Sequence, residues 1–382
     1  MLRYLTAGET HGRCLTAIID GMPQGVKIDC NKINNALFRR QSGYGRGGRM
    51  AIEKDSVQIL SGVRGGYSIG SPISIMIQNR DWENWEDIMS IENASAERCV
   101  TSPRPGHADL AGGMKYNHKD LRNVLERASA RETAARVAAG AIAMQLLEEF
   151  SVKCFSRCVS IGKVSDEVTV LDTDFFHRAM NSPVGFGSEN TEKRAMQYID
   201  DIKKDGESVG GVVETMFVNV PVGLGSYSQY DRKLDARLAM AAMSIQAVKG
   251  VEIGMGFEAA KTLGSKVHDE IICKDQKFIR KTNNAGGIEG GISNGEPIVV
   301  RAAMKPIPTL YSPLRTVDIN TKEEKKASVE RSDVCAVPAC SVVLEHCIGF
   351  EIANAFLEKF GGDCMEDIKQ SYQAYINRIS AY

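Results

Sequence analysis

The stretch Ser129-Ala-Arg-Glu-Thr-Ala-Ala-Arg-Val-Ala-Ala-Gly-Ala-Ile-Ala-Met144 carries the clearest fold signal in this chain. Ser129 and Glu132 have the spacing of a capping box, which predicts that Ser129 caps the N-terminus of a helix. From Ala134 to Met144 the side chains are small and apolar nearly all round. We therefore expect a helix over about 130–150 that is buried, with its neighbours packed close against it.

Strands and helices are interleaved on both sides of this helix. Strand-like runs occupy 72–78, 212–220 and 297–304. Helical patterns occupy 31–40, 231–244 and 338–360, followed by a helical tail over about 361–382. Because there is no fixed repeat and no low-complexity linker, the pattern predicts an α/β or α+β fold in a single large domain spanning 1–382. The order is not a regular β-α-β alternation, so a doubly wound sheet is not favoured.

The composition excludes several classes of protein. The 382 residues are 43% hydrophobic, which is enough for a sizeable core and excludes a disordered chain. Lys plus Arg (47) nearly balances Asp plus Glu (48), whereas nucleic-acid-binding proteins usually carry a basic excess. The ten cysteines are scattered without a C-x-x-C pair, and neither a signal peptide nor an apolar run approaching ~18 residues is present. We expect a soluble cytoplasmic protein with buried, reduced thiols and no nucleic-acid or membrane partner.

The N-terminus of the predicted helix is a candidate anion site. Its free backbone N–H groups and positive dipole end are flanked by Arg127 and Arg131. Plain capping of a core helix accounts for the same residues, so this segment alone leaves both interpretations open.

A second candidate anion site is the segment Arg39-Arg40-Gln-Ser-Gly-Tyr-Gly-Arg46-Gly-Gly-Arg49. Between 31 and 52 there are five basic residues and no acidic one. Arginines on a glycine-rich loop can form forked hydrogen bonds to phosphate or carboxylate, although a charge run is more often a solvated loop. Gly43-x-Gly45-x-x-Gly48 matches the dinucleotide-binding fingerprint, but a helical segment precedes it where that motif needs a strand, so we reject this interpretation.

Two of the six histidines are candidates for proton transfer. His11 and His107 lie in polar loops between glycines, where an imidazole is poorly placed as a core residue. No H-x-x-x-H or paired Cys/His spacing supports a metal site. The remaining histidines are expected at surface or ordinary core positions: His118, His177, His268 and His346.

Two later segments are weaker signals. Arg331 and Asp333 precede Pro338 at a predicted helix entrance. Lys305 follows a strand and begins a proline-containing segment that is typical of an edge or turn.

Taken together, these segments resemble the chorismate synthase family from residue 1 to about residue 360, in the family's order. The early motifs are Gly8-Glu-Thr-His11-Gly12, Arg104-Pro-Gly-His107-Ala-Asp109 and Arg127-Ala-Ser-Ala-Arg-Glu-Thr133. The later motifs are Ala247-Val-Lys-Gly-Val-Glu252, the glycine loop over 286–295, Lys305-Pro306 and Arg331-Ser-Asp333-Val-Cys335. Thr10 and Ala128 stand where the family often has serine. Threonine keeps the hydroxyl, whereas alanine can offer only a backbone contact.

The resemblance implies a fold, a reaction and a cofactor. The fold is a β-α-β sandwich, assembled as a homotetramer. The reaction is the anti 1,4-elimination of phosphate from 5-enolpyruvylshikimate 3-phosphate to give chorismate, the last common step of the shikimate pathway. Reduced FMN is required without net oxidation, because the flavin lends an electron to the substrate and then recovers it. NADPH enters only indirectly, as an electron source for flavin reduction, and no metal is implied.

The resemblance also implies roles for individual residues. His11 protonates the leaving phosphate, His107 faces the N1–O2 edge of the reduced flavin, and Asp333 relays a proton at N5. The residues assigned to FMN are Arg127, Ala128, Ser129, Gln246, Ala247, Gly290, Lys305, Pro306, Ile307, Pro308, Thr309 and Arg331. The arginines assigned to the substrate phosphate and carboxylates, or to the NADP side, are Arg40, Arg46, Arg49, Arg104 and Arg131.

Two functions from other classes remain open at this point. In a flavin oxidoreductase that consumes NAD(P)H, the arginines near Arg40 and Arg46 would accept a 2′-phosphate. In a non-catalytic RNA-binding protein, the Arg/Gly segment would contact the phosphate backbone, although the balanced charge argues against this. The sequence leaves open whether the enzyme reduces its own flavin.

Overall fold

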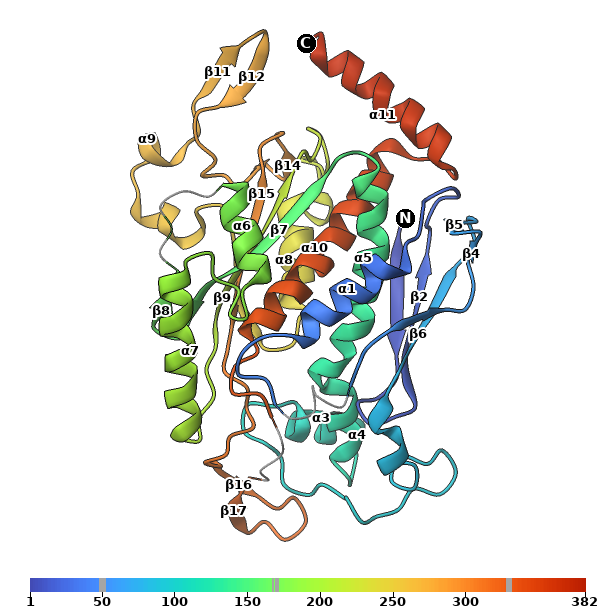
Figure 1. Cartoon of the computed structure of the whole chain (residues 1–382), viewed down its shortest axis with the longest axis vertical. Coiled ribbons are helices and arrows are strands. Elements are labelled where there is room, and N and C mark those ends of the chain that lie inside the picture. Colours follow the sequence, from blue (N-terminus) through green and yellow to red (C-terminus); the bar gives the residue numbers. More distant parts are fainter. Residues whose placement is uncertain (48–52, 167, 169–171, 328–331) are drawn as a thin grey trace.

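Two antiparallel sheets face each other across a layer of helices in the computed structural model (Figure 1). The structure describes residues 1–47, 53–166, 168, 172–327 and 332–382. The first sheet has the order β1-β2-β6-β3 and the second the order β10-β15-β9-β7-β8. The strands of the first sheet are β1 (Arg3–Ala7), β2 (Cys14–Asp20), β6 (Ile73–Gln78) and β3 (Val57–Ile59). Those of the second are β10 (Val248–Ile253), β15 (Ile298–Met304), β9 (Gly211–Val218), β7 (Lys153–Ile161) and β8 (Val164–Ser165).

The helix layer is built around α5 (Thr133–Glu148) and α10 (Val337–Phe360), which pack against each other. Helix α5 contacts β2 in the first sheet, and α10 contacts β7 and β9 in the second (Figure 1). The small side chains of α5 make this arrangement possible, because the two helices touch at Gly140. A Cβ atom there would lie 2.3 Å from the carbonyl oxygen of His346 on α10. The predicted burial of α5 and the predicted mixed fold, a β-α-β sandwich, are both confirmed.

The start of α5 differs in detail from the predicted capping box. Residues 130–132 form a 3₁₀ turn, η2 (Ala130–Glu132), and the Ser129 hydroxyl accepts a hydrogen bond from the Arg131 backbone N–H. Ser129 is therefore an N-cap, as predicted. The Glu132 carboxylate does not return to Ser129, because it accepts hydrogen bonds from Thr6, Arg136 and Gln246 instead.

The other predicted elements are present with small shifts at their ends. The segments 31–40, 231–244 and the C-terminal tail correspond to α1 (Cys30–Gln41), α8 (Leu234–Met243) with the preceding turn η3 (Tyr230–Arg232), and α11 (Met365–Ser380). Further helices among the described residues are η1 (Arg80–Asn84), α3 (Asp109–Tyr116), α4 (Arg122–Ala128), α6 (Thr173–Asn181), α7 (Glu189–Lys204), η4 (Gly256–Lys261) and α9 (Gly264–Val267). Short strand pairs are β4–β5 (Val63–Arg64, Tyr67–Ser68), β11–β12 (Ile271–Lys274, Lys277–Arg280), β13–β14 (Ile288–Glu289, Ile292–Ser293) and β16–β17 (Arg315–Val317, Glu324–Lys326).

Helix α10 is long and apolar enough to cross a membrane, and it is the one such helix among the described residues. In this fold 83% of its most apolar window is buried inside the protein, which is the environment of a core helix. The ten cysteines are all free. The expectation that they are buried is wrong for Cys30, Cys99 and Cys273, which lie at the surface because they fall on a helix start, a loop and a hairpin outside the core.

An ion pair inside the helix layer links α1 to α10. The Arg39 guanidinium donates to both carboxylate oxygens of Glu345, at 3.0 and 2.8 Å, and the Ser156 hydroxyl donates to the same carboxylate at 2.6 Å. Burial alone would raise the pKa of Glu345, but the charge of Arg39 and these hydrogen bonds outweigh it and lower the pKa to about 2.

This ion pair predicts acid sensitivity of the fold. A carboxyl group with a lowered folded-state pKa stabilises the protein above its unfolded pKa, near 4.5, and loses that contribution as the pH falls toward 2. We expect urea unfolding at pH 6, 5, 4 and 3 to show stability falling across this window, with a smaller slope in Glu345→Gln. Glu148→Gln, which alters an exposed ion pair with Lys32, is the control. Equal slopes in the wild type and Glu345→Gln would contradict the prediction.

Candidate active site

His11 lies in the turn between β1 and β2 and is held by α4. Its ring Nδ1 lies 2.8 Å from Glu126 Oε1, and its backbone N–H donates to Glu126 Oε2 at 2.8 Å. The neighbouring Thr10 donates from both its N–H and its hydroxyl to the Glu126 carbonyl oxygen. The imidazole stacks on the Trp85 ring, with 3.7 Å between centroids and 18° between planes. His11 is therefore fixed in position rather than carried on an open loop.

Glu126 is itself balanced by a positive charge. The Arg122 guanidinium, one helical turn earlier on α4, donates to Glu126 Oε1 at 3.1 Å. Burial alone would raise the pKa of Glu126, but the hydrogen bonds from His11 and the charges around it outweigh this and lower the pKa. The carboxylate beside His11 is thus ionised at neutral pH and can only accept hydrogen bonds.

His107 has an equivalent arrangement in the segment 104–109, which we call the histidine loop. Its Nδ1 lies 2.6 Å from Asp109 Oδ1, and Asp109 Oδ2 accepts from the Arg104 side chain at 2.9 Å and from the Arg104 backbone N–H at 3.0 Å. The Asp109 side chain is fully buried at the start of α3. Burial opposes ionisation, yet the bonds from His107 and Arg104 hold the pKa of Asp109 well below its usual range.

Asp333 lies against the predicted arginine segment, whose described part we call the arginine loop (40–47). Arg46 Nε lies 3.1 Å from Asp333 Oδ2, and the Gly47 backbone N–H donates to Asp333 Oδ1 at 2.6 Å. The arginine loop and the segment that carries Ser332 and Asp333 are in backbone contact, because a Cβ atom on Gly47 would lie 2.9 Å from the carbonyl oxygen of Ser332. The glycine spacing in this loop therefore permits close backbone approach to Asp333.

The predicted FMN segments 246–247 and 305–309 meet beside the histidine loop. We call 305–309 the lysine loop. The Lys305 N–H donates to the Ala247 carbonyl oxygen at 2.9 Å, and the Lys305 ammonium donates to the Gly106 carbonyl oxygen. Gln246 donates to Glu132 at 3.1 Å, while its own carbonyl oxygen, Oε1, is buried without a hydrogen-bond partner.

Two arginines assigned to the substrate are buried and already paired with a carboxylate. Arg131 donates to both oxygens of Asp55 at 2.7 Å and to the side-chain oxygen of Asn79 at 2.8 and 3.0 Å. Arg40 lies 3.7 Å from the same Asp55. Burial and the nearby charges of Arg131 and Arg46 lower the pKa of Arg40 to about 10 despite Asp55. The segment 31–52 contains no acidic residue, but in the folded protein Asp55 and Asp333 lie next to its arginines.

These contacts form a closed circuit of loops. The histidine loop contacts the lysine loop, Thr309 of the lysine loop accepts from Ser332, and Asp333 contacts the arginine loop. In the arginine loop, Arg40 lies close to Asp55, which also accepts hydrogen bonds from Arg131. Glu132, next to Arg131 in the sequence, accepts a hydrogen bond from Gln246, and the adjacent Ala247 accepts one from Lys305 of the lysine loop. Asn79 joins the His11 turn to this circuit, since it donates to the Gly12 carbonyl oxygen at 2.6 Å. These contacts thus connect most of the predicted residues that the structure describes.

One described position among the predicted residues, Gly290, stands outside this circuit. Gly290 lies in the β13–β14 hairpin, whose Gly291 accepts from Leu234 at the start of α8, whereas Gln246 follows the other end of that helix. Arg49 and Arg331 lie outside the described residues. Arg127 is at the rim, where its side chain donates to the carbonyl oxygens of Thr6 and Gly8.

The sequence analysis missed the partners of the predicted residues. They are Asp55, Asn79, Trp85, Asp109, Arg122, Glu126 and Glu132. Asp109 and Glu126 lie within or next to motifs that the sequence analysis quoted, so their position beside His107 and Arg127 was the signal that could have found them. Asp55, Asn79 and Trp85 carry no local signal.

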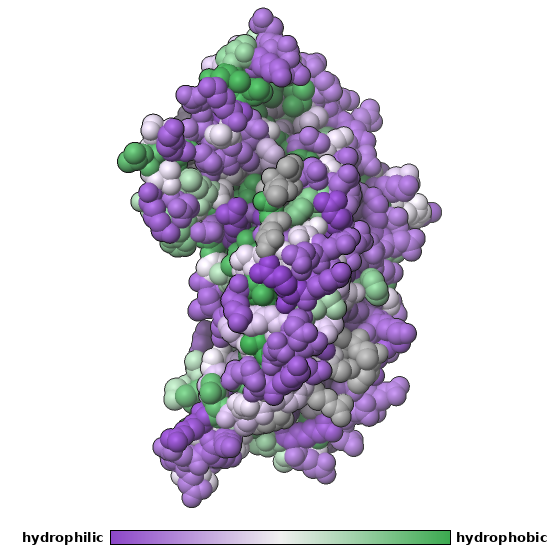
Figure 2. Space-filling model, turned by 60° about the vertical axis from the view of Figure 1, so that its left-hand side comes forward, coloured by the Kyte–Doolittle hydropathy of each residue, from purple (hydrophilic) through white to green (hydrophobic). Residues whose placement is uncertain are grey.

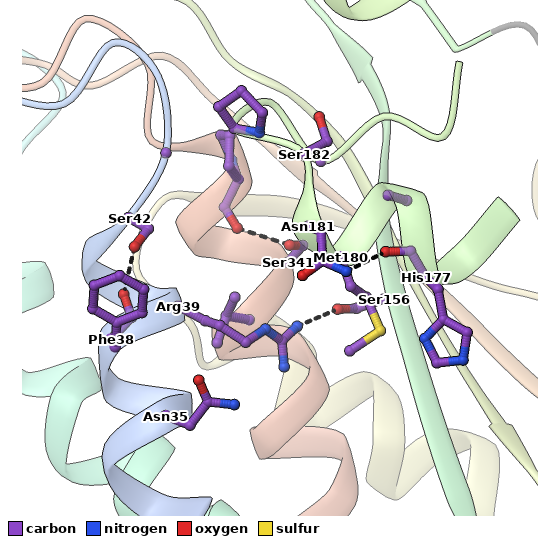
Figure 3. A pocket seen from close by; sticks show the side chains of 16 residues that line it. Asn35, Phe38, Arg39, Ser42, Ser156, His177, Met180, Asn181, Ser182 and Ser341 are labelled. Atoms are coloured by element: carbon purple, nitrogen blue, oxygen red, sulfur yellow. Dashed lines mark hydrogen bonds between the residues drawn. The ribbon is translucent and has the colours of Figure 1, made fainter. Parts of the chain in front are cut away.

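A cavity of about 530 Å³ lies elsewhere, between α1, α6 and α10 (Figure 3). None of the residues predicted for catalysis or FMN lines it. Figure 3 shows the Arg39 side chain directed at Ser156, to which it donates a hydrogen bond of 3.2 Å. The charge of Arg39 is compensated by Glu345, so Arg39 does not give this cavity a free positive charge for an anion. The loop circuit therefore remains the better candidate site. In the described part of the chain no three His, Cys, Asp or Glu side chains are grouped to hold a metal ion.

Comparison with known proteins places this chain in a family. The family model of chorismate synthase matches residues 2–357. The chorismate synthase of Geobacter metallireducens is 56% identical over 393 aligned positions covering 100% of both chains, and that of Aquifex aeolicus is 54% identical over 394 positions, covering 100% of this chain and 99% of its own. A crystal structure of chorismate synthase matches with a TM-score of 0.81 and 44% identity, covering 100% of this chain and 99% of its own.

The fold and these similarities define a lyase of the sandwich type that acts on a small-molecule substrate. The chain belongs to the chorismate synthase family.

Proposed function

We propose that this chain catalyses the anti 1,4-elimination of phosphate from 5-enolpyruvylshikimate 3-phosphate, giving chorismate, with reduced FMN bound and no net redox change. The observation that supports this most directly is the closed circuit of loops. It gathers two histidines, an aspartate and four arginines from sequence positions as far apart as His11 and Asp333. The substrate carries one phosphate and two carboxylates, so binding it requires several positive groups in one place.

The residues around the lysine loop are suited to hold FMN. Gln246 Oε1 is a buried acceptor without a partner, which a donor on the flavin or its ribityl chain would satisfy. Lys305 supplies a positive charge next to the histidine loop, and Ser129 and Ala130 begin a helix N-terminus that favours anions. When bound, reduced FMN supplies reversible electron donation to the substrate. Gly290 and Arg331 remain assigned to FMN by the family resemblance.

The two histidines and Asp333 have distinct proposed roles. His11, held at Nδ1 by Glu126, gives a proton to the departing phosphate. His107, held at Nδ1 by Asp109, holds a proton at the N1–O2 edge of the flavin. Asp333 accepts a proton near flavin N5, and Arg46 keeps its carboxylate in place. Among the proposed substrate arginines, Arg104 contacts His107 and Arg46 pairs with Asp333. Arg40 and Arg131 are buried and both pair with Asp55, which lies between them and links them to the site.

We further propose that the active form is a cytoplasmic homotetramer. Figure 2 shows a mainly hydrophilic face on which apolar side chains gather in limited areas. Large apolar residues are exposed on η4, directly before α9 and on the β11–β12 hairpin, where Phe257, Leu263, Ile271 and Phe278 are 72, 78, 61 and 59% exposed. Contacts between copies of the chain would remove such side chains from water. Light scattering of the purified protein measures the assembly directly.

The proposed reaction predicts that reduced FMN is required but not consumed. Anaerobic incubation of the enzyme with photoreduced FMN and 5-enolpyruvylshikimate 3-phosphate should release chorismate and phosphate in equal amounts over many turnovers per flavin. Chorismate absorbance, phosphate release and flavin absorbance are followed together. Turnover with oxidised FMN and no reductant, or one flavin oxidised per chorismate formed, would contradict the proposal. Steady NADPH consumption without the substrate would support a flavin oxidoreductase instead.

A further inference from the structure

Glu126 holds Thr10 and His11 through four hydrogen bonds. Its carboxylate accepts from His11 Nδ1 and from the His11 backbone N–H, both at 2.8 Å. Its carbonyl oxygen accepts from the Thr10 N–H at 3.0 Å and from the Thr10 hydroxyl at 2.8 Å. The Glu126 side chain is 1% exposed and the His11 side chain 11% exposed, so the contact between Glu126 and His11 is shielded from solvent on the side of Glu126.

We propose that Glu126 is a positioning residue that holds the proton of His11 on Nδ1 and leaves proton exchange with the substrate to Nε2. This inference rests on the proposed function, in which His11 is the acid for the departing phosphate. A neutral imidazole has one donor nitrogen and one acceptor nitrogen, and an ionised carboxylate only accepts. The nitrogen facing Glu126 must therefore carry a hydrogen, whichever charge state the ring adopts.

The surroundings of His11 fix the ring plane as well as the tautomer. Trp85 lies parallel to the imidazole, and the Arg98 guanidinium lies 4.1 Å from the Trp85 centroid. The Arg122 guanidinium lies 5.1 Å from the same centroid and also donates to Glu126. Trp85 thus restricts rotation of the imidazole, while Arg122 shares the charge of Glu126 with His11. The Glu126 carboxylate accepts hydrogen bonds both from Arg122, which is permanently charged, and from the His11 ring. Because Arg122 already compensates its charge, Glu126 does not require a positively charged His11 ring.

The direct test is the ¹⁵N spectrum of the full-length protein labelled in histidine, recorded from pH 6 to 9. His11→Ala assigns the His11 signals. We expect Nδ1 of His11 to be protonated throughout, with a proton shifted downfield by its bond to a carboxylate. Glu126→Gln, which has the same shape but no charge, should move that proton upfield. Asp109→Asn should move the His107 signals and not those of His11. A wild-type His11 that carries its hydrogen on Nε2 with Nδ1 bare would overturn the proposal, and apart from the assignment by His11→Ala this outcome depends on the wild-type protein alone.

Kinetics separate this inference from the proposed function itself. Outer hydrogen-bond partners of metal-bound histidines are worth ~10–100-fold, and we expect a fall of that size in kcat for Glu126→Gln with KM changed less than about threefold. The control Glu148→Gln makes the same chemical change at an exposed ion pair and should keep normal kcat. Unchanged kcat in Glu126→Gln would overturn the positioning role. If His11→Ala itself keeps normal turnover, the proposed role of His11 fails, and the spectrum still decides whether Glu126 sets the tautomer.

Discussion

His11→Ala and His107→Ala should each lower turnover by ~10²–10⁴-fold while leaving the protein folded and able to bind FMN. Each imidazole is held at Nδ1 by a buried carboxylate, at 2.8 Å in His11 and 2.6 Å in His107. Losing either ring removes a positioned proton donor or acceptor. Both side chains are largely buried, but Arg122 and Arg104 would still pair with the carboxylates of Glu126 and Asp109, so each variant should remain folded.

Steady-state rates with reduced FMN, together with FMN titration and thermal unfolding, check this prediction. His268→Ala is the matched control, because His268 is exposed and lies on neither α3 nor α4. Near-normal turnover in His11→Ala or in His107→Ala would remove the catalytic assignment of that residue alone. Loss of folding in either variant would show that the carboxylate–histidine pair is mainly structural.

Asp55→Ala should destabilise the protein by ~3–5 kcal/mol, the cost of removing one partner from a buried ion pair. The Asp55 carboxylate is fully buried and accepts two hydrogen bonds of 2.7 Å from Arg131, and Arg40 lies 3.7 Å away. Without Asp55, these two guanidiniums would face each other with less compensation. Burial already lowers the pKa of Arg40 to about 10 in the presence of Asp55.

Urea unfolding monitored by circular dichroism measures this effect. Asp55→Asn keeps the shape and one acceptor oxygen but loses the charge, so its loss of stability should lie between those of the wild type and Asp55→Ala. Asp20→Ala is the matched control, because Asp20 pairs with Arg3 at the surface, where a loss of under ~1 kcal/mol is usual. A change of that small size in Asp55→Ala would show that the ion pair is not a source of stability.

Much of the secondary structure could be predicted, because its signals are local. The run at 72–78 became β6 and the run at 297–304 became β15, each within one residue. The small-residue pattern of α5 also predicted a tight neighbour, and Gly140 meets α10 in the structure. The exposed Cys30 shows the limit of such reasoning, since composition alone cannot assign one cysteine to the core and another to a helix start.

The sequence by itself determined the order of the elements, the two proton-transfer histidines as candidates, and the family, since each of these depends on residues that are close together along the chain. The charge state of the site was decided by the tertiary structure alone. Asp333 meets Gly47 across 286 positions, and Arg131 meets Asp55 across 76. Coulomb energy depends on separation in space, and burial multiplies it by excluding water. For that reason a basic segment with no acid in its sequence neighbourhood became, once folded, a network of paired charges.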